Sequence, residues 1–195
     1  MPSIPASLAR SRPSNRGQIY LSGAMQYASD GTLGSSWRKS CSATLRSMDY
    51  VSLDIADMDI EYTKEHDTVG DVVCQVSDSH DENQMLLMKA NVREHFIRAD
   101  LNLIQYHSDA MIVKYDEGVR RGAGTISECQ FAYNHSVPVF LVNEYDTFEA
   151  VPGWLAALTT KMFPTWEDLY DYLDRLPYGI LIADEYGNRR AGSKY

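Results

Sequence analysis

Hydrophobic and polar residues alternate along this chain with two different periods. Short apolar runs rich in Val, Ile, Leu and Tyr, bounded by Gly, Ser, Pro or Asp, are typical of buried strands. Between these runs, apolar residues recur at the i, i+3 and i+4 spacing that is typical of amphipathic helices. The runs predict strands at 18–21, 50–53, 110–113, 137–142 and 178–182. The spaced patterns predict helices at 37–48, 83–107, 125–134 and 166–176.

Strands and helices that alternate in this order predict an α/β fold. We expect a single domain of three layers around a central, mostly parallel five-stranded sheet of the Rossmann or flavodoxin-like kind. A length of 195 residues fits one domain with one sizeable core. Ligands of such folds bind beyond the carboxyl ends of the strands, so we expect the functional site in the segments that follow the first four strands.

Two segments differ in composition from the rest. Residues 1–17 contain three Pro, three Arg and no acid, which predicts a disordered basic arm. An acidic insertion at about 54–83 carries ten Asp or Glu and one Lys. It lacks the DxDxDG spacing of a Ca²⁺ loop, so a solvated loop is the preferred interpretation. We expect the domain to span 18–185 and a flexible tail to occupy 186–195.

Charge and composition exclude several classes of protein. The 18 Lys and Arg against 27 Asp and Glu leave a net charge of −9, which opposes binding to a nucleic-acid polymer. The sequence has no run of apolar residues long enough to span a membrane and no secretory signal pattern. The three Cys never form a CxxC pair, which argues against a zinc site or a disulfide framework. We therefore expect a soluble cytoplasmic protein with no metal and no membrane partner.

The segment from Gly122 to Glu128 offers one candidate for chemistry. Gly122 and Gly124 precede a predicted helix, where glycine lets a ligand approach the backbone and the helix N-terminus favours an anion. The same residues match a capping box, in which Glu128 only satisfies the backbone amide of Thr125. No Walker loop and no GxGxxG pattern is present. Both interpretations of Glu128 stay open on this motif alone.

Two further residues are ordinary when taken singly. Asp100 lies at the edge of the apolar stripe of the helix predicted at 83–107, where a surface acid is common. Tyr20 lies in the first predicted strand, where a core aromatic with a satisfied hydroxyl is the simplest interpretation.

Three motifs follow one another along the chain. They are Ile19-Tyr20-Leu21-Ser22-Gly23-Ala24-Met25, Arg98-x-Asp100-Leu-x-x-Ile104-x-x-x-x-Asp109-Ala-x-Ile-Val, and Gly124-Thr125-x-x-Glu128-x-x-x-Ala132-x-x-x-x-Val137-Pro138-Val139. In this order and spacing, from about residue 18 to 176, they resemble the nucleoside 2-deoxyribosyltransferase superfamily, which includes nucleoside 5′-monophosphate N-glycosidases. The predicted helix that begins at Trp166 also resembles those enzymes.

The resemblance implies that Glu128 is the nucleophile, that Asp100 handles the proton of the nucleobase, and that Tyr20 orients Glu128. It implies cleavage or transfer of the N-glycosidic bond of a (deoxy)nucleoside or nucleoside monophosphate, by a retaining double displacement through a glycosyl-glutamate. No cofactor is implied. Family members assemble from several subunits, so a homodimer or higher homo-oligomer is expected, with residues near Trp154 contributing across the interface.

The same resemblance and the loop positions suggest residues that bind substrate. These are Gly23, Met25, Asp54, Gly122, Gly124 and Thr125. The monophosphate-cleaving branch has a serine where this chain has Gly122, and Arg120 and Arg121 are alternative phosphate ligands. Two other functions stay open: an NAD-type glycohydrolase that uses one glutamate, and a protein that binds or sequesters a nucleotide without catalysis.

Overall fold

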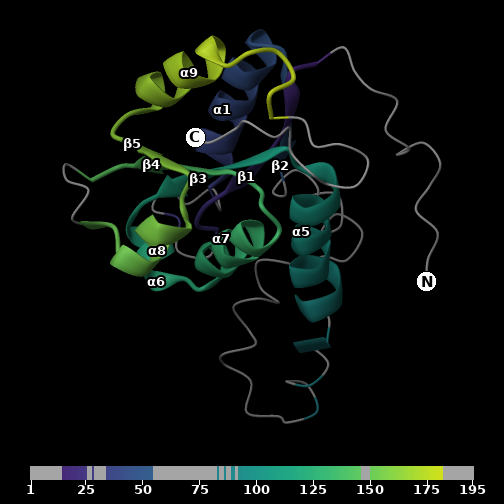
Figure 1. Ribbon diagram of the computed structural model, residues 1–195. Helices are drawn as coiled ribbons and strands as arrows, with labels where there is room; N and C mark the ends of the chain where they lie inside the picture. Colours follow the sequence, from purple (N-terminus) through teal and green to yellow (C-terminus); the bar gives the residue numbers. More distant parts are fainter. Residues whose placement is uncertain are drawn as a thin grey trace, which may run out of the picture.

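The fold is an α/β sandwich around a five-stranded parallel sheet (Figure 1). The computed structural model describes residues 15–25, 28, 34–54, 83, 86, 89–90, 92–145 and 150–181. The strands are β1 (Gly17–Ser22), β2 (Tyr50–Asp54), β3 (Ala110–Tyr115), β4 (Val139–Asn143) and β5 (Lys161–Phe163). Their order in the sheet is β2-β1-β3-β4-β5, and each neighbouring pair is parallel. The α/β class and the three layers predicted from the sequence are confirmed.

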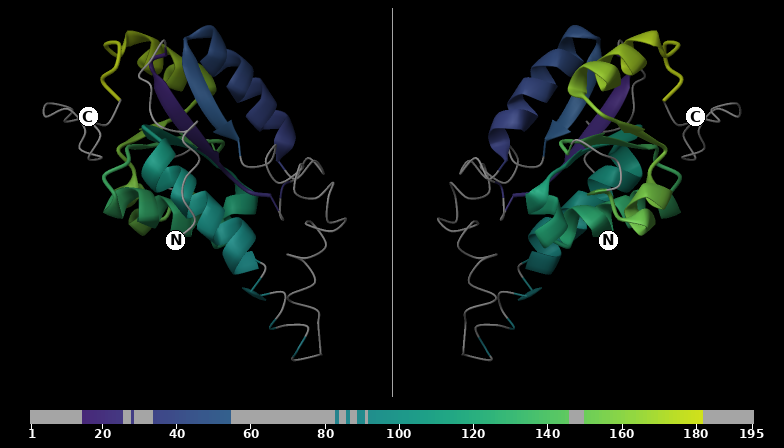
Figure 2. Two further views of the ribbon diagram at one scale, coloured as in Figure 1. Left: turned by 90° about the vertical axis from the view of Figure 1, so that its right-hand side faces the viewer. Right: turned by 90° about the vertical axis from the view of Figure 1, so that its left-hand side faces the viewer.

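Helices cover both faces of this sheet (Figure 2). One layer holds α1 (Ser35–Ser47) and α9 (Trp166–Arg175). The other holds α6 (Glu117–Arg121), α7 (Gly124–Asn134), α8 (Gly153–Leu158) and a continuous helical stretch. That stretch runs through η2 (Val92–Ile97), α5 (Arg98–Asn102) and η3 (Leu103–His107), of which the first and last have wider π-type turns. In the described part of the chain, no helix has the length and apolar character needed to cross a bilayer.

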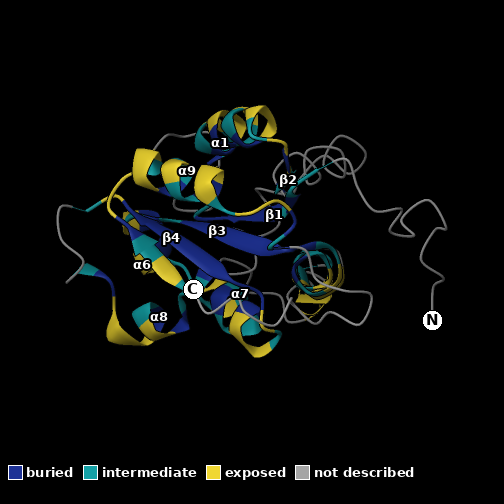
Figure 3. Ribbon diagram, turned by 45° about the horizontal axis from the view of Figure 1, so that its top comes forward, coloured by how far each residue is buried: buried dark blue, intermediate teal, exposed yellow. Residues whose placement is uncertain are grey.

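Alternation along the central strands divides the core into two halves, and burial is deepest at the sheet (Figure 3). In β3, Met111 and Val113 pack toward α7, whereas Ile112 packs toward α1 and α9. Both faces of the strand are apolar because helices cover both, as is usual in parallel sheets. Tyr20 of β1 lies on the α7 side and is fully buried.

The prediction of the fifth strand is wrong. The run at 178–182 forms no strand in its described residues, since Tyr178 to Leu181 make a turn in which Gly179 adopts φ 71°. The apolar residue Leu181 of this run packs in the core beside α9 without belonging to a strand. The fifth strand is instead β5, whose three residues are too few to produce a recognisable apolar run. The helices α6 and α8 were likewise not predicted, because each has only five or six residues.

The expected basic arm meets the first strand at Arg16 and Gly17. Gly17, which was expected to end the arm, begins β1, and the side chain of Arg16 before it is hydrogen-bonded to the carbonyl of Leu173. Residues 1–14 of the arm, 55–82 of the acidic insertion and the whole tail at 186–195 lie outside the described residues.

Arg16 joins the start of β1 to the end of α9. Its Nη2 donates to the carbonyl oxygens of Leu173, Asp174 and Leu176 at 2.9, 2.8 and 2.6 Å. Its guanidinium also lies over the ring of Tyr50, 5.0 Å from the centroid. The last carbonyls of a helix have no partner within the helix, and a cation there also complements the helix dipole.

We expect Arg16→Ala to lower the free energy of unfolding by about 1–3 kcal/mol, because three carbonyls lose a charged donor. Urea unfolding measures this change. Lys39→Ala is the matched control, since it removes one positive charge from an exposed position on α1. Equal losses in the two variants would contradict the capping role of Arg16.

Candidate active site

Glu128 of α7 is hydrogen-bonded to two hydroxyl groups of the neighbouring strand β1. The Tyr20 hydroxyl donates to Oε1 of Glu128 at 3.0 Å, and the Ser22 hydroxyl donates to Oε2. Tyr20 and Ser22 are two positions apart on one strand, so their side chains point to the same face of the sheet. Both are buried, with exposed fractions of 0% and 1%. The carboxylate of Glu128 is therefore held against the central sheet.

This geometry excludes the capping-box interpretation. The cap of α7 is Ala123, and no side chain caps this end of the helix. Thr125 consequently lies inside the first turn instead of preceding it, and a capping box requires it at the cap position. The Glu128 carboxylate accepts hydrogen bonds from the hydroxyls of Tyr20 and Ser22, and not from the backbone amide of Thr125.

Asp100 of α5 lies close enough to Tyr20 to act on its hydroxyl electrostatically. Burial raises the pKa of Tyr20 well above its ordinary value of 10.0, and the charges of Glu128 and then Asp100 raise that pKa further. Arg38 lowers the same pKa by a smaller amount. Both carboxylates thus lie within electrostatic range of one phenol, and α5 packs against α7. The structure brings Tyr20, Asp100 and Glu128 into one region of the molecule.

The Glu128 site lies beside two neighbouring strands, β1 and β3, after which the chain passes to opposite faces of the sheet. After β1 the chain enters α1 in one helical layer, and after β3 it enters α6 and α7 in the other (Figure 1). β1 and β3 are neighbours in the sheet. In open α/β sheets the carboxyl ends of two such strands form the usual ligand site.

Arg38 of α1 binds the main chain directly after β1 and directly before α1. Its Nη2 donates to the carbonyl of Gly23 at 2.8 Å, and its Nη1 donates to the carbonyl of Gly34 at 3.0 Å. Its Nε lies 3.7 Å from Oδ1 of Asp54 at the end of β2, with exposed side-chain fractions of 1% and 6%. A buried arginine therefore joins α1 to the ends of two strands.

The glycines expected to bind substrate have different surroundings. A Cβ atom on Gly23 would lie 2.8 Å from the ring of Trp37, so close packing against this ring accounts for that glycine. A Cβ atom on Gly124 would have no neighbour within 4 Å, so this residue borders open space at the start of α7. Gly122 is half-buried, and its amide donates to the carbonyl of Gly118 at 3.1 Å.

The other residues predicted to bind substrate are Met25, Thr125 and Asp54. Met25 packs against the core half that contains Tyr20, and Thr125 is buried with 7% exposed. Asp54 is paired with Arg38. A substrate-binding role for these residues stays a prediction.

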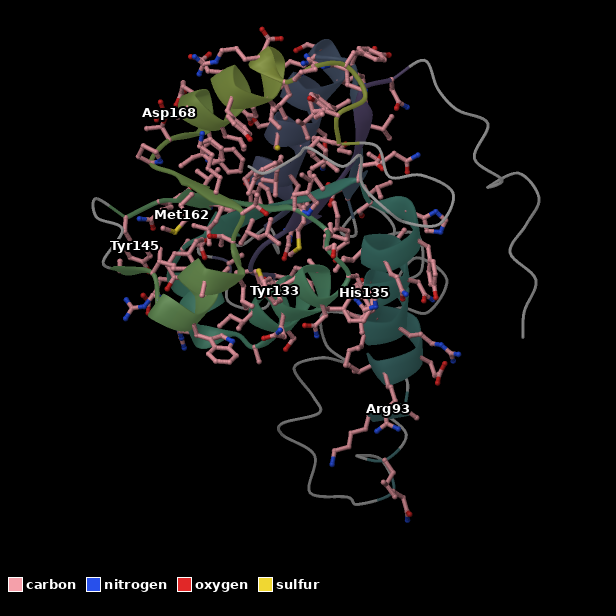
Figure 4. All side chains as sticks on the ribbon, in the orientation of Figure 1. Arg93, Tyr133, His135, Tyr145, Met162 and Asp168 are labelled. Carbon is pink, nitrogen blue, oxygen red and sulfur yellow. The ribbon has the colours of Figure 1, made fainter. Side chains whose placement is uncertain are left out.

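Arg120, considered above as a phosphate ligand, is engaged at the protein surface. Its Nη1 lies 3.1 Å from Oε2 of Glu117, and its guanidinium lies over the ring of Tyr145. Figure 4 places Tyr145 on the side of the molecule opposite α5, which carries Asp100.

Trp154, near which a subunit interface was expected, lies on α8 and is 73% exposed. The homo-oligomer stays a prediction.

Three residues near the strand ends were not predicted from the sequence: Ser22, Arg38 and Lys114. Lys114 of β3 lies 3.3 Å from Asp116 and 3.3 Å from Glu144. Ser22 has a signal in the sequence, because it follows Tyr20 at the spacing that places two side chains on one face of a strand. Arg38 and Lys114 have no such signal.

Among the described residues, no group of three or more His, Cys, Asp or Glu is arranged to hold a metal ion.

Comparison with known proteins finds similar chains among the solved structures. No family model and no curated protein matches the chain. A 2-deoxyribosyltransferase from the psychrotolerant bacterium Bacillus psychrosaccharolyticus is similar in structure, with 14% identity and a TM-score of 0.48. The match covers 84% of this chain and 95% of that chain. The activity in that name belongs to the neighbour.

We expect Arg38→Met to lower the free energy of unfolding by about 3–5 kcal/mol, because it removes the buried cation beside the carboxylate of Asp54 and the donor to the carbonyls of Gly23 and Gly34. Arg98→Met is the control, since Arg98 pairs with Glu94 at 2.6 Å but has 64% of its side chain exposed. That variant should change the free energy by less than about 0.5 kcal/mol. Urea unfolding of both variants measures the difference, and similar losses would contradict the structural role of the buried pair.

The raised pKa of Tyr20 makes stability depend on pH in the alkaline range. The unfolded chain loses this proton near pH 10.0 and the folded chain at a higher pH. The contribution is therefore complete below pH 10 and is lost as the pH rises toward the folded pKa. We expect the free energy of unfolding of the wild type to fall more steeply above pH 10 than that of Tyr20→Phe, by up to about 1.4 kcal/mol per pH unit.

Unfolding in urea at several pH values from 8 to 11 tests this expectation. Between pH 8 and 9 the two proteins should show parallel pH dependence, which provides the internal control. Parallel curves above pH 10 as well would contradict the raised pKa of Tyr20.

Proposed function

We propose that this protein cleaves or transfers the N-glycosidic bond of a nucleoside or nucleoside monophosphate, through a covalent glycosyl ester of Glu128. One observation carries the proposal: a carboxylate from α7 is bound by two buried hydroxyls of β1, beside the carboxyl ends of the central strands. The order of motifs in the sequence supports the same substrate class. Asp100 lies in the same region and supplies the second carboxyl group that the reaction needs.

In the first step, an oxygen of Glu128 attacks the anomeric carbon of the sugar. The carbon–nitrogen bond breaks, its electron pair leaves with the base, and protonated Asp100 gives the base a proton. Positive charge develops on the sugar as this bond breaks, and a nearby carboxylate stabilises it. The products are free base and a glycosyl ester on Glu128.

In the second step, water or another base attacks the anomeric carbon from the face that the first base left. Asp100, now a carboxylate, takes the proton from the attacking group, and the bond to Glu128 breaks. Glu128 returns to a carboxylate and Asp100 to its protonated form. Two inversions give overall retention, and the arrangement requires the two carboxyl groups to lie about 5 Å apart.

Tyr20 acts in this scheme as a positioning residue. Its raised pKa keeps the phenol protonated at neutral pH, so it can donate a hydrogen bond to Glu128 in every step. A donor of this kind keeps one oxygen of the nucleophile in place before the sugar binds.

Two substitutions at the carboxyl groups test the mechanism. We expect Glu128→Gln to lower kcat at least about 10³-fold, because an amide cannot form the ester. Asp100→Asn should lower kcat by about 10²–10⁴-fold with natural bases. With a substrate whose leaving group needs no proton, Asp100→Asn should recover most of the rate and Glu128→Gln should not. Glu167→Gln, an exposed change on α9, is the control.

The assay incubates the protein with deoxynucleosides, ribonucleosides, their monophosphates and NAD⁺, each with and without an acceptor base. Chromatography of the products and rapid-quench mass measurement of the intact protein give the readout. Release or exchange of base, with one glycosyl residue added to the wild type but not to Glu128→Gln, supports the proposal. Base release by Glu128→Gln at the wild-type rate would refute the role of the nucleophile.

Two outcomes favour the other functions considered from the sequence. Release of nicotinamide from NAD⁺ with no action on nucleosides contradicts the proposed substrate and favours an NAD-type glycohydrolase. A ligand that raises Tm but stays intact contradicts catalysis and favours a binding protein.

A further inference from the structure

Ser22 contacts the second oxygen of the proposed nucleophile. Its hydroxyl donates to Oε2 of Glu128, whereas Tyr20 donates to Oε1. The motif resemblance assigns no role to Ser22. At 1% exposure, the side chain lies away from bulk water.

Two donors on two oxygens restrict the carboxylate more than one donor does. The last torsion of a glutamate side chain has a broad energy minimum, so a carboxylate held at one oxygen still rotates. A second donor at the other oxygen removes this rotation. An attack on carbon requires the oxygen lone pair to be aligned with the breaking bond, and small errors in alignment are costly.

The main chain that carries Ser22 is itself fixed. Ser22 is the last residue of β1, where it is in register with Val113 of β3. The next residue, Gly23, packs beneath Trp37, and its carbonyl accepts from the buried Arg38. The Ser22 hydroxyl is therefore presented to Glu128 from a rigid support, as a site built on strands requires.

We infer that Ser22 is a second positioning residue for Glu128 and that Ser22 and Tyr20 act together to aim the carboxylate at the sugar. The inference rests on the proposed function. It predicts that loss of the hydroxyl slows formation of the glycosyl ester and leaves substrate binding nearly unchanged, because the Ser22 hydroxyl is bonded to the nucleophile.

The test compares Ser22→Ala with Ser127→Ala. Ser127 precedes Glu128 on the same helix, but its hydroxyl donates to the carbonyl of Ala123 at 2.9 Å. We expect Ser22→Ala to lower kcat by about 10–100-fold with KM within about twofold, and Ser127→Ala to retain wild-type kcat. Ser22→Thr, which keeps the hydroxyl and suits a strand, should remain within about fivefold of the wild type.

Rapid-quench measurement of the glycosyl-enzyme at saturating substrate locates the defect. The rate of ester formation should fall in Ser22→Ala by the same factor as kcat. The double variant with Tyr20→Phe should lose less than the product of the two single losses, because both hydroxyls act on one carboxylate.

Two results separate failure of this inference from failure of the proposed function. Ser22→Ala with wild-type kcat, while Glu128→Gln is inactive, would overturn the role of Ser22 and leave the glycosyl-transfer proposal standing. A wild-type protein that acts on no nucleoside and no nucleoside monophosphate would overturn the proposed function itself. A rise in KM with unchanged kcat in Ser22→Ala would also overturn the positioning role.

Discussion

The bonds from Glu128 to the hydroxyls of β1 are the interaction around which the site is organised. A carboxylate next to an apolar sheet needs hydrogen-bond donors, because an unpaired charge in that position is very costly. Tyr20 and Ser22 supply those donors from a single strand. The first turns of α7 are consequently attached to the centre of the sheet through the residue that the proposed chemistry uses.

β1 receives a second polar attachment from the opposite helical layer. Arg38 of α1 donates to the carbonyl of Gly23, directly after Ser22, and its guanidinium lies beside Asp54 at the end of β2. Helices on both faces of the sheet are therefore joined to the carboxyl end of the same strand. This arrangement gives the loop after β1 a fixed starting point, although the strand is only six residues long.

Electrostatics near the strand ends reflect the acidic character of the chain. The net charge is −9, and the described basic residues near the site, Arg38 and Lys114, each lie beside acidic partners. The carboxylate of Glu128 adds negative charge close to the phenol of Tyr20. A reaction that develops positive charge on a sugar is favoured in such surroundings, because the fixed charges have the opposite sign to the charge of the transition state.

The sequence by itself determined the α/β class, the first four strands and the helix that begins at Trp166, because each depends on a local period of apolar residues. It did not identify β5, whose three residues form a strand because they pair with β4 and show no apolar pattern of their own.

The local sequence also could not decide the role of Glu128. Its local motif fits a helix cap as well as a nucleophile, and only the tertiary structure, which brings Tyr20 across 108 positions of sequence to its carboxylate, decided that it is not a cap. Local patterns report which face of an element is buried, whereas the partner of a buried charge is set by the packing of distant elements.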